Sequence, residues 1–226
     1  DWRGFGRSVV ECSSYWFPDY LADLHALLEV YSPAEPVRLV GHSMGANIGG
    51  LYAGTMPERV RAFVNVEGFG LTDSEPDAAP RRYRQWLEQS QDLPTFTRYA
   101  DRHAFAAKIL QRNPQMSAAQ ADFVAGVWGV AQADGQFELR ADVRHKLPNP
   151  VLYRRAEAEA CWRAITADVL LVSGGASQCA LTAGQQESSV WQDAATVEMA
   201  GAGHMLHFET PHELAAVIEA FFSKYL

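Results

Sequence analysis

The residues with the clearest chemical potential form the pentapeptide GHSMG at residues 41–45. It follows an apolar run at 37–40 and precedes a stretch at 46–55 with helical spacing, so it places a serine on a sharp turn between a strand and a helix. A glycine on each side of the serine lets the two backbones approach closely. The pattern predicts Ser43 as a nucleophile and the backbone N–H of Met44, near the start of the helix, as an oxyanion donor.

A serine hydroxyl is a poor nucleophile unless a base takes its proton, and His204 fits that role best. A strand is expected at 195–200, a glycine-rich turn follows, and His204 comes directly after it. Thr210 and Glu213 then predict a capping box at the start of the next helix. The remaining histidines have settings typical of solvated or hydrogen-bonded side chains; His42 is expected to point away from the serine, and the others are His25, His103, His145, His207 and His212.

The elements that must position these residues alternate between strands and helices. Buried strands are predicted near residues 37, 61, 167 and 195, with the strand before Ser43 at an open, apolar edge. Between the second and third strands the spacing predicts helices over 81–89, 97–111, 117–129 and 157–165, and Ser117 with Gln120 predicts a capping box. This order is typical of an α/β fold with a mostly parallel sheet.

Three segments together resemble the α/β-hydrolase superfamily: DWRGFGRS at 1–8, GHSMG at the elbow and GAGHMLHFETP at 201–211. They occur in the order of the family's signature loops. The resemblance covers nearly the whole chain except roughly 71–165, where such enzymes often carry a helical cap between strands six and seven, and the run at 140–162 loosely resembles serine-hydrolase-like members. It implies a hydrolase core at 1–70 and 166–226 and a cap at 71–165.

Relative to that family, the chain begins at the loop that normally follows the fourth strand. We therefore expect the preceding strands to be missing from this chain, together with the loop that donates the second oxyanion N–H. An unseen N-terminal segment, a separate chain or a second copy is expected to complete the sheet.

The acid of the triad departs from the family pattern. It usually follows the seventh strand, but here the strand at 169–173 is followed by GGASQC at 174–179, which contains no carboxylate. Glu67 ends the strand at 61–66 and lies 24 residues after Ser43, which resembles the relocated glutamate of haloalkane dehalogenases. Asp73 and an acid-free pair of serine and histidine remain open as alternatives.

Composition fits a soluble enzyme. The 226 residues can bury a sizeable core, and 48% hydrophobic with 20% charged residues is ordinary for a globular protein. A net charge of −8 argues against nucleic acid or an anionic membrane as a partner, and no apolar run is long enough to cross a bilayer. Three cysteines without metal-ligand spacing favour a reducing, cytoplasmic location and predict neither a metal nor another cofactor.

The resulting hypothesis is a serine hydrolase that cleaves a carboxylic ester of small or medium size through an acyl-enzyme. Ser43 attacks, His204 moves the proton, Glu67 orients the imidazole and Met44 N–H stabilises the oxyanion. Thioesters, lactones and certain carbon–carbon bonds remain open as substrates, because the same triad serves them. A non-catalytic ligand-binding or scaffold protein on a hydrolase fold is the alternative from a different class.

Overall fold

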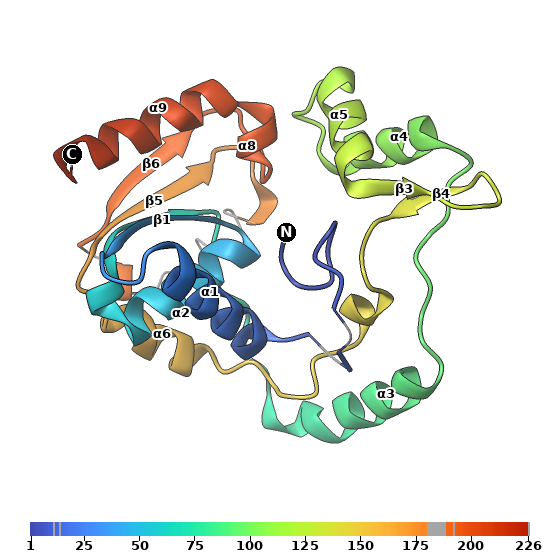
Figure 1. Cartoon of the computed structure of the whole chain (residues 1–226), viewed down its shortest axis with the longest axis horizontal. Helices are drawn as coiled ribbons and strands as arrows, with labels where there is room; N and C mark the ends of the chain where they lie inside the picture. The colour runs from blue at the N-terminus through green and yellow to red at the C-terminus, as the bar shows by residue number, and fades with distance from the viewer. Residues whose placement is uncertain (11, 14, 180–188, 192, 226) are drawn as a thin grey trace. The chain divides into compact units, whose positions relative to one another are not determined.

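The structure is a computed structural model that describes residues 1–10, 12–13, 15–179, 189–191 and 193–225. The chain divides into two compact units (Figure 1). Unit 1 holds Asp1–Tyr20 and Ser74–Tyr153, and unit 2 holds Leu21–Asp73 and Arg154–Leu226. Helix α1 (Phe17–Tyr31) begins in the first and continues in the second. All four residues predicted for the active site belong to unit 2.

A four-stranded parallel sheet forms the centre of unit 2. Its strands are β1 (Val37–His42), β2 (Val60–Val66), β5 (Asp168–Gly174) and β6 (Ala195–Met199), in the order β1-β2-β5-β6. The four predicted strands are confirmed, and the strand before Ser43 lies at an end of this order as expected. Because parallel strands end at the same edge, the segments that follow β1, β2, β5 and β6 meet there.

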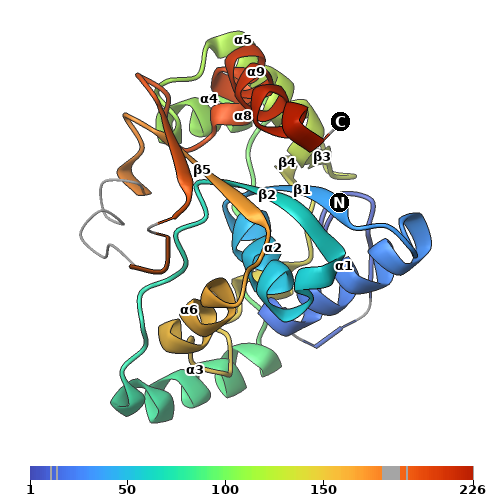
Figure 2. The same ribbon diagram turned by 90° about the vertical axis from the view of Figure 1, so that its left-hand side faces the viewer.

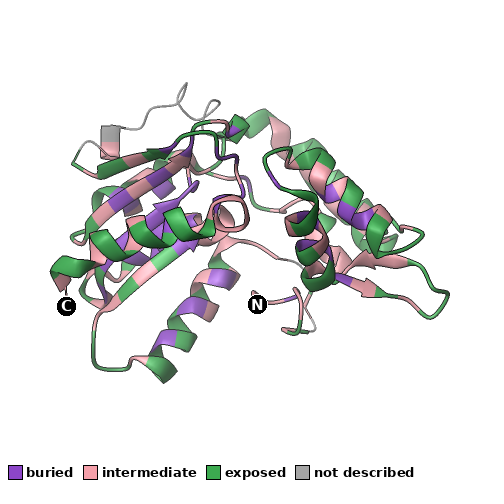
Figure 3. Ribbon diagram, turned by 90° about the horizontal axis from the view of Figure 1, so that it is seen from above, coloured by how far each residue is buried: buried purple, intermediate pink, exposed green. Residues whose placement is uncertain are grey.

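Helices cover both faces of this sheet (Figure 2). On one face lie α2 (Met44–Thr55) and α6 (Arg155–Arg163), and on the other lie α8 (Leu206–Glu209) and α9 (Pro211–Phe222). Side chains of β2 alternate between them: Phe63 packs against α2 at Gly49, whereas Val64 joins a core with Leu214 of α9. Figure 3 shows buried residues in strands and helices alike; they include six of the seven residues of β2 and six residues of α2.

Unit 1 is mainly helical. It contains α3 (Ala79–Gln91), α4 (Arg102–Arg112) and α5 (Ala118–Trp128), and the capping box predicted for Ser117 and Gln120 is present at the start of α5. Two short antiparallel strands follow, β3 (Gly129–Ala131) and β4 (Phe137–Leu139). This hairpin could not be predicted from the sequence, because three-residue strands carry too little alternation of apolar and polar residues.

The capping box predicted for Thr210 and Glu213 is wrong. Thr210 precedes α9, but its side chain makes no capping hydrogen bond; its hydroxyl donates to the Leu206 carbonyl instead, at 3.3 Å. The short helix α8 directly before α9 supplies that carbonyl and competes for the hydroxyl. Among the helices of the described residues, none combines the length and the apolar character that crossing a bilayer requires.

Candidate active site

The turn at Ser43 has the geometry of a strained elbow between β1 and α2. Ser43 has φ 51° and ψ −117°, a conformation that a residue with a side chain adopts only at a cost in free energy. Its N–H donates to the Val66 carbonyl at 2.8 Å and ties the turn to β2. A Cβ on Gly41 would lie 2.5 Å from the Gly45 carbonyl oxygen, so the first glycine of the motif is required for the close approach of strand and helix.

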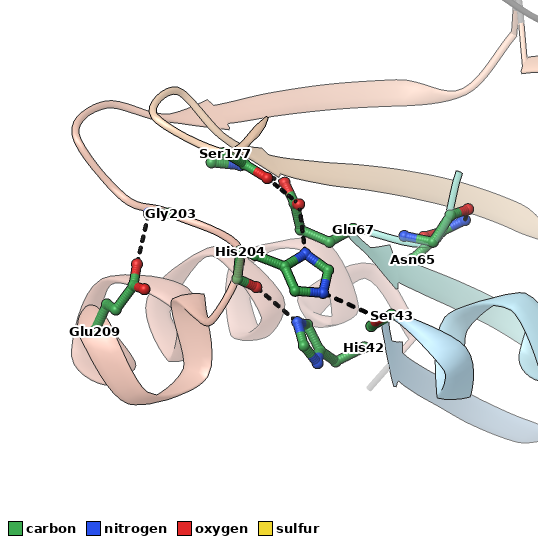
Figure 4. A network of polar contacts seen from close by, with 10 residues as sticks. His42, Ser43, Asn65, Glu67, Ser177, Gly203, His204 and Glu209 are labelled. Carbon is green, nitrogen blue, oxygen red and sulfur yellow. Dashed lines mark hydrogen bonds and ion pairs between the residues drawn. The ribbon is translucent and has the colours of Figure 1, made fainter. Parts of the chain in front are cut away.

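His204 lies in the loop after β6, as predicted, and its ring reaches Ser43 (Figure 4). The His204 Nε2 atom lies 3.0 Å from Ser43 Oγ. The preceding residue, Gly203, donates its N–H to a carboxylate oxygen of Glu209 at 2.5 Å, which holds this loop against α8. The structure therefore brings together two side chains that are 161 positions apart in the sequence.

Glu67, which the sequence suggests as the acid, lies beside His204. It follows β2, its side chain is fully buried, and its Oε2 atom lies 2.9 Å from His204 Nδ1. The same oxygen accepts from the Ser177 hydroxyl at 2.5 Å, and Oε1 accepts from the Gly174 N–H at 2.7 Å. These three donors satisfy a buried carboxylate that would otherwise be costly to desolvate.

The alternatives to Glu67 are placed differently. Asp73 Oδ1 accepts from the backbone N–H of Arg155 at 3.0 Å, near the start of α6. The loop after β5 has no carboxylate, but it supplies the two donors, Gly174 and Ser177, that hold Glu67. The segment after β5 therefore holds the Glu67 carboxylate in place and contributes no carboxylate of its own.

A second turn after Glu67 is as constrained as the elbow. Among the described residues with a side chain, only Ser43 and Glu67 have positive φ, and Glu67 has φ 58°. The Asn65 side chain accepts from the Gly68 N–H at 2.8 Å and donates to the Gly68 carbonyl at 2.9 Å. A Cβ on Gly68 would lie 2.4 Å from the Ala46 Cβ, so this loop passes directly over α2. Positive φ among these residues therefore occurs at the two whose side chains contact the ring nitrogens of His204.

The hydrogen bonds determine which nitrogen of His204 carries the proton. The Glu67 carboxylate can only accept, so Nδ1 must donate to it. In a neutral ring this leaves Nε2 as an acceptor for the Ser43 hydroxyl. The imidazole is thus oriented to act as a base toward Ser43.

Met44 is the first residue of α2, as the sequence predicted. The first N–H groups of a helix have no acceptor within the helix and lie at the positive end of its dipole. They are available to stabilise negative charge that forms beside Ser43.

A pocket of about 420 Å³ opens beside these residues, entirely within unit 2. Ser43, Glu67 and His204 form part of its wall. The remaining lining is mixed, with apolar Phe69 and Leu71 and polar Asn47, Thr72, Gln178 and Cys179. One group of the wall, Glu67, Cys179 and His204, combines donor types that could hold a metal ion.

His42 was expected from the sequence to point away from the serine, and its ring contacts the loop that carries His204. Its Nε2 atom lies 2.7 Å from the His204 carbonyl oxygen, and that oxygen can only accept, so His42 Nε2 carries a proton and donates. Burial lowers the pKa of His42, which keeps the ring neutral at neutral pH. The residue directly before Ser43 therefore connects the turn between β1 and α2 to the loop that carries His204.

His207 lies in α8, and its ring centre is 4.3 Å from that of His42. Burial, with a smaller contribution from the charges that His42 and His204 would carry, lowers the pKa of His207 to about 4. The sequence could have indicated that His207 lies against His42 only if the short helix α8 had been predicted.

These features define a class of protein: a parallel sheet flanked by helices, with a serine on a strand-to-helix elbow and a histidine and a carboxylate at the same ends of the strands. The sequence profile of the family described as alpha/beta hydrolase fold matches residues 1–211. The chain belongs to the alpha/beta hydrolase fold family.

Individual relatives agree with this assignment. A serine hydrolase-like protein of Danio rerio is 25% identical, over 92% of this chain and 66% of the relative. The crystal structure of the hypothetical protein PA1622 from Pseudomonas aeruginosa PAO1 is similar with a TM-score of 0.85 and 25% identity, covering 100% of this chain and 80% of that chain. A thioesterase domain from the curacin biosynthetic pathway has a TM-score of 0.82 and 24% identity, with 96% and 79% coverage, which is a likeness of fold.

Proposed function

We propose that this chain is a serine hydrolase that cleaves a carboxylic ester of small or medium size through an acyl-enzyme. One observation carries the proposal: the Ser43 hydroxyl, the His204 ring and the Glu67 carboxylate form a continuous chain of hydrogen bonds of 3.0 and 2.9 Å. This is the arrangement that raises the nucleophilicity of a serine.

In the acylation half of the reaction, Ser43 Oγ bonds to the ester carbonyl carbon while its proton passes to His204 Nε2. The carbonyl electron pair moves onto oxygen, and the Met44 N–H stabilises the resulting charge. The carbon–oxygen bond to the alcohol then breaks, and the imidazolium returns the proton to the departing alkoxide. Glu67 favours the charged imidazolium in both steps, because its carboxylate is adjacent to Nδ1.

Deacylation follows the same path with water as the nucleophile. His204 Nε2 takes a proton from water as its oxygen attacks the acyl carbon, and then returns a proton to Ser43 Oγ as the acid product leaves. Cys179 lines the same pocket; the residue is exposed, but partial burial of its sulfur and the neighbouring Glu67 charge raise the pKa of the thiol. At neutral pH it is protonated, which supports Ser43 as the nucleophile.

The pocket supports the proposed size of substrate. About 420 Å³ suits an ester with a short or medium acyl group. Phe69 and Leu71 offer apolar contact for that group, and Asn47 offers a polar one. The cap role of residues 71–165 and the cytoplasmic location stay predictions.

Thioesters are a second candidate substrate class, favoured by the similarity of fold to the curacin thioesterase domain. The same acyl-enzyme would form, with a thiol in place of the alcohol. Rates with oxygen esters and thioesters of the same acyl group, across a series of chain lengths, separate the two. A higher kcat/KM for the thioester at every length would transfer the proposal to that class.

Labelling with a fluorophosphonate probe tests whether the chain is an enzyme at all. We expect stoichiometric labelling of Ser43 and none in Ser43→Ala, because only an activated hydroxyl reacts. Ser90→Ala, at an exposed serine of α3, is the matched control and should label like the original chain. A folded original chain that remains unlabelled would favour the ligand-binding alternative.

A further inference from the structure

Three side chains with different donor atoms converge at one end of the pocket. Glu67, Cys179 and His204 each offer one atom, a carboxylate oxygen, a sulfur and a ring nitrogen, and these atoms all lie within 4.8 Å of one another. They come from the segments after β2, β5 and β6. Glu67 is buried and Cys179 is exposed, so the cluster has one fixed side and one side open to solvent.

This donor set matches the coordination chemistry of zinc. Sulfur, imidazole nitrogen and carboxylate oxygen are its usual ligands, at about 2.0–2.3 Å and in tetrahedral geometry, which places neighbouring ligand atoms about 3.5 Å apart. Reaching that spacing from separations of up to 4.8 Å takes a small movement. The exposed Cys179 side chain can supply it by rotation, while Ser177 and Gly174 hold Glu67 in place.

We propose that Glu67, Cys179 and His204 form an inhibitory site for a thiophilic divalent metal ion of the zinc type. The inference of inhibition rests on the proposed serine-hydrolase function, whereas the inference of metal binding does not. Three protein ligands leave a fourth position for water. The site is a regulatory one, since the catalytic steps derived above use Glu67 and His204 without a metal.

Metal binding would remove the base. The ion bonds to Glu67 Oε2 and His204 Nδ1, on the side where these two atoms are now 2.9 Å apart, and to the Cys179 thiolate. The thiol proton is released to solvent, and the imidazole proton moves from Nδ1 to Nε2. The ring then presents a donor to Ser43 Oγ, where catalysis requires an acceptor.

Titration of the full, chelator-treated chain with zinc chloride tests the inhibition. We expect zinc to abolish both ester turnover and fluorophosphonate labelling of Ser43, and a chelator to restore both. In Cys179→Ser the concentration for half inhibition, relative to that variant's own uninhibited rate, should rise at least about tenfold because a ligand is lost. Cys161→Ser is the matched control. Cys161 is also a free cysteine, but it lies in α6 and is not one of the three proposed ligands, so this variant should keep the original sensitivity to zinc.

Cobalt serves as a spectroscopic probe of binding that needs no activity. A bound Co²⁺ should show a thiolate-to-cobalt charge-transfer band that Cys179→Ser loses and Cys161→Ser retains. Equal zinc sensitivity in the original chain and Cys179→Ser, or the absence of the thiolate band, would overturn the metal site. Absence of Ser43 labelling without any metal would instead overturn the proposed function, so the two failures are distinguishable.

Discussion

At the scale of single residues, the proposed site depends on a carboxylate at a strand end where the family resemblance does not place it. Glu67 follows β2, whereas the loop after β5 contributes only the donors Gly174 and Ser177. In the proposed mechanism, what matters is a carboxylate oxygen 2.9 Å from His204 Nδ1, whichever strand end supplies it.

Glu67→Gln tests this assignment. The amide keeps the size of the side chain but removes the charge. Its NH₂ group can donate a hydrogen bond to His204 Nδ1, whereas the carboxylate could only accept one, so the imidazole loses its preferred tautomer. We expect kcat to fall by about 10³–10⁴ with KM little changed. Steady-state kinetics on a chromogenic ester measures both values.

Asp73→Asn is the matched control for the same change of charge. Asp73 accepts from the Arg155 N–H near the start of α6, so its loss should affect the stability of that helix more than turnover. If Asp73→Asn lost the larger share of kcat, the role of the acid would transfer to Asp73.

At the scale of elements, the turn between β1 and α2 must bring two backbones into contact. A Cβ on Gly41 would lie 2.5 Å from the Gly45 carbonyl oxygen and 2.6 Å from the Ala46 Cα. Both are backbone atoms, which cannot rotate away as a side chain can. The position of Ser43 therefore requires that residue 41 has no side chain.

We expect Gly41→Ala to lower the free energy of unfolding by about 1–3 kcal/mol or more. Urea unfolding followed by circular dichroism measures the loss. Gly175→Ala is the control, because its nearest contact would be the flexible end of the Glu198 side chain at 3.1 Å. An equal, small loss in both variants would mean that the elbow has room for a side chain.

The elements that carry the site could be predicted because their signals are local. The GHSMG motif and the apolar run before it determine β1, Ser43 and the start of α2, and the structure has them at those residues. The Asp73 alternative could not be eliminated from the sequence, since 137 positions separate Glu67 from His204 and only the folded sheet brings them together.

Other features depended on contacts that no local pattern contains. His42 reaches the carbonyl of a residue 162 positions away, and Cys179 meets Glu67 and His204 from a different strand end. Metal-ligand spacing in a sequence reveals only ligands that lie on one short segment. The cap on α9 was predicted wrongly for a different reason: the short helix α8 was not predicted, and the Leu206 carbonyl, four residues before Thr210, accepts from the Thr210 hydroxyl.

At the scale of the whole molecule, the half-buried histidine His207 connects the site to the stability of the fold. His207 has a folded-state pKa of about 4, against 6.5 for a free side chain. Between these values the unfolded chain binds more protons than the folded one. The stabilisation from a neutral His207 is therefore complete above pH 6.5 and is lost as the pH falls toward 4.

Thermal unfolding from pH 7 to 4.5 measures this effect. His207→Gln cannot titrate, so its melting temperature should fall less over that range than that of the original chain. His103→Gln is the control, because the His103 side chain is 88% exposed, and it should follow the original chain. Identical pH profiles for all three proteins would show that His207 is not held neutral by the fold.

The central claim is that Ser43 carries the acyl group between the two halves of the reaction. Rapid-quench kinetics with a p-nitrophenyl ester, followed by peptide mass analysis, tests it most directly. We predict a burst of p-nitrophenol equal to the enzyme concentration and an acyl mass increase on the peptide that contains Ser43, both absent in Ser43→Ala. Turnover without acylation of Ser43, or turnover retained in Ser43→Ala, would contradict the claim.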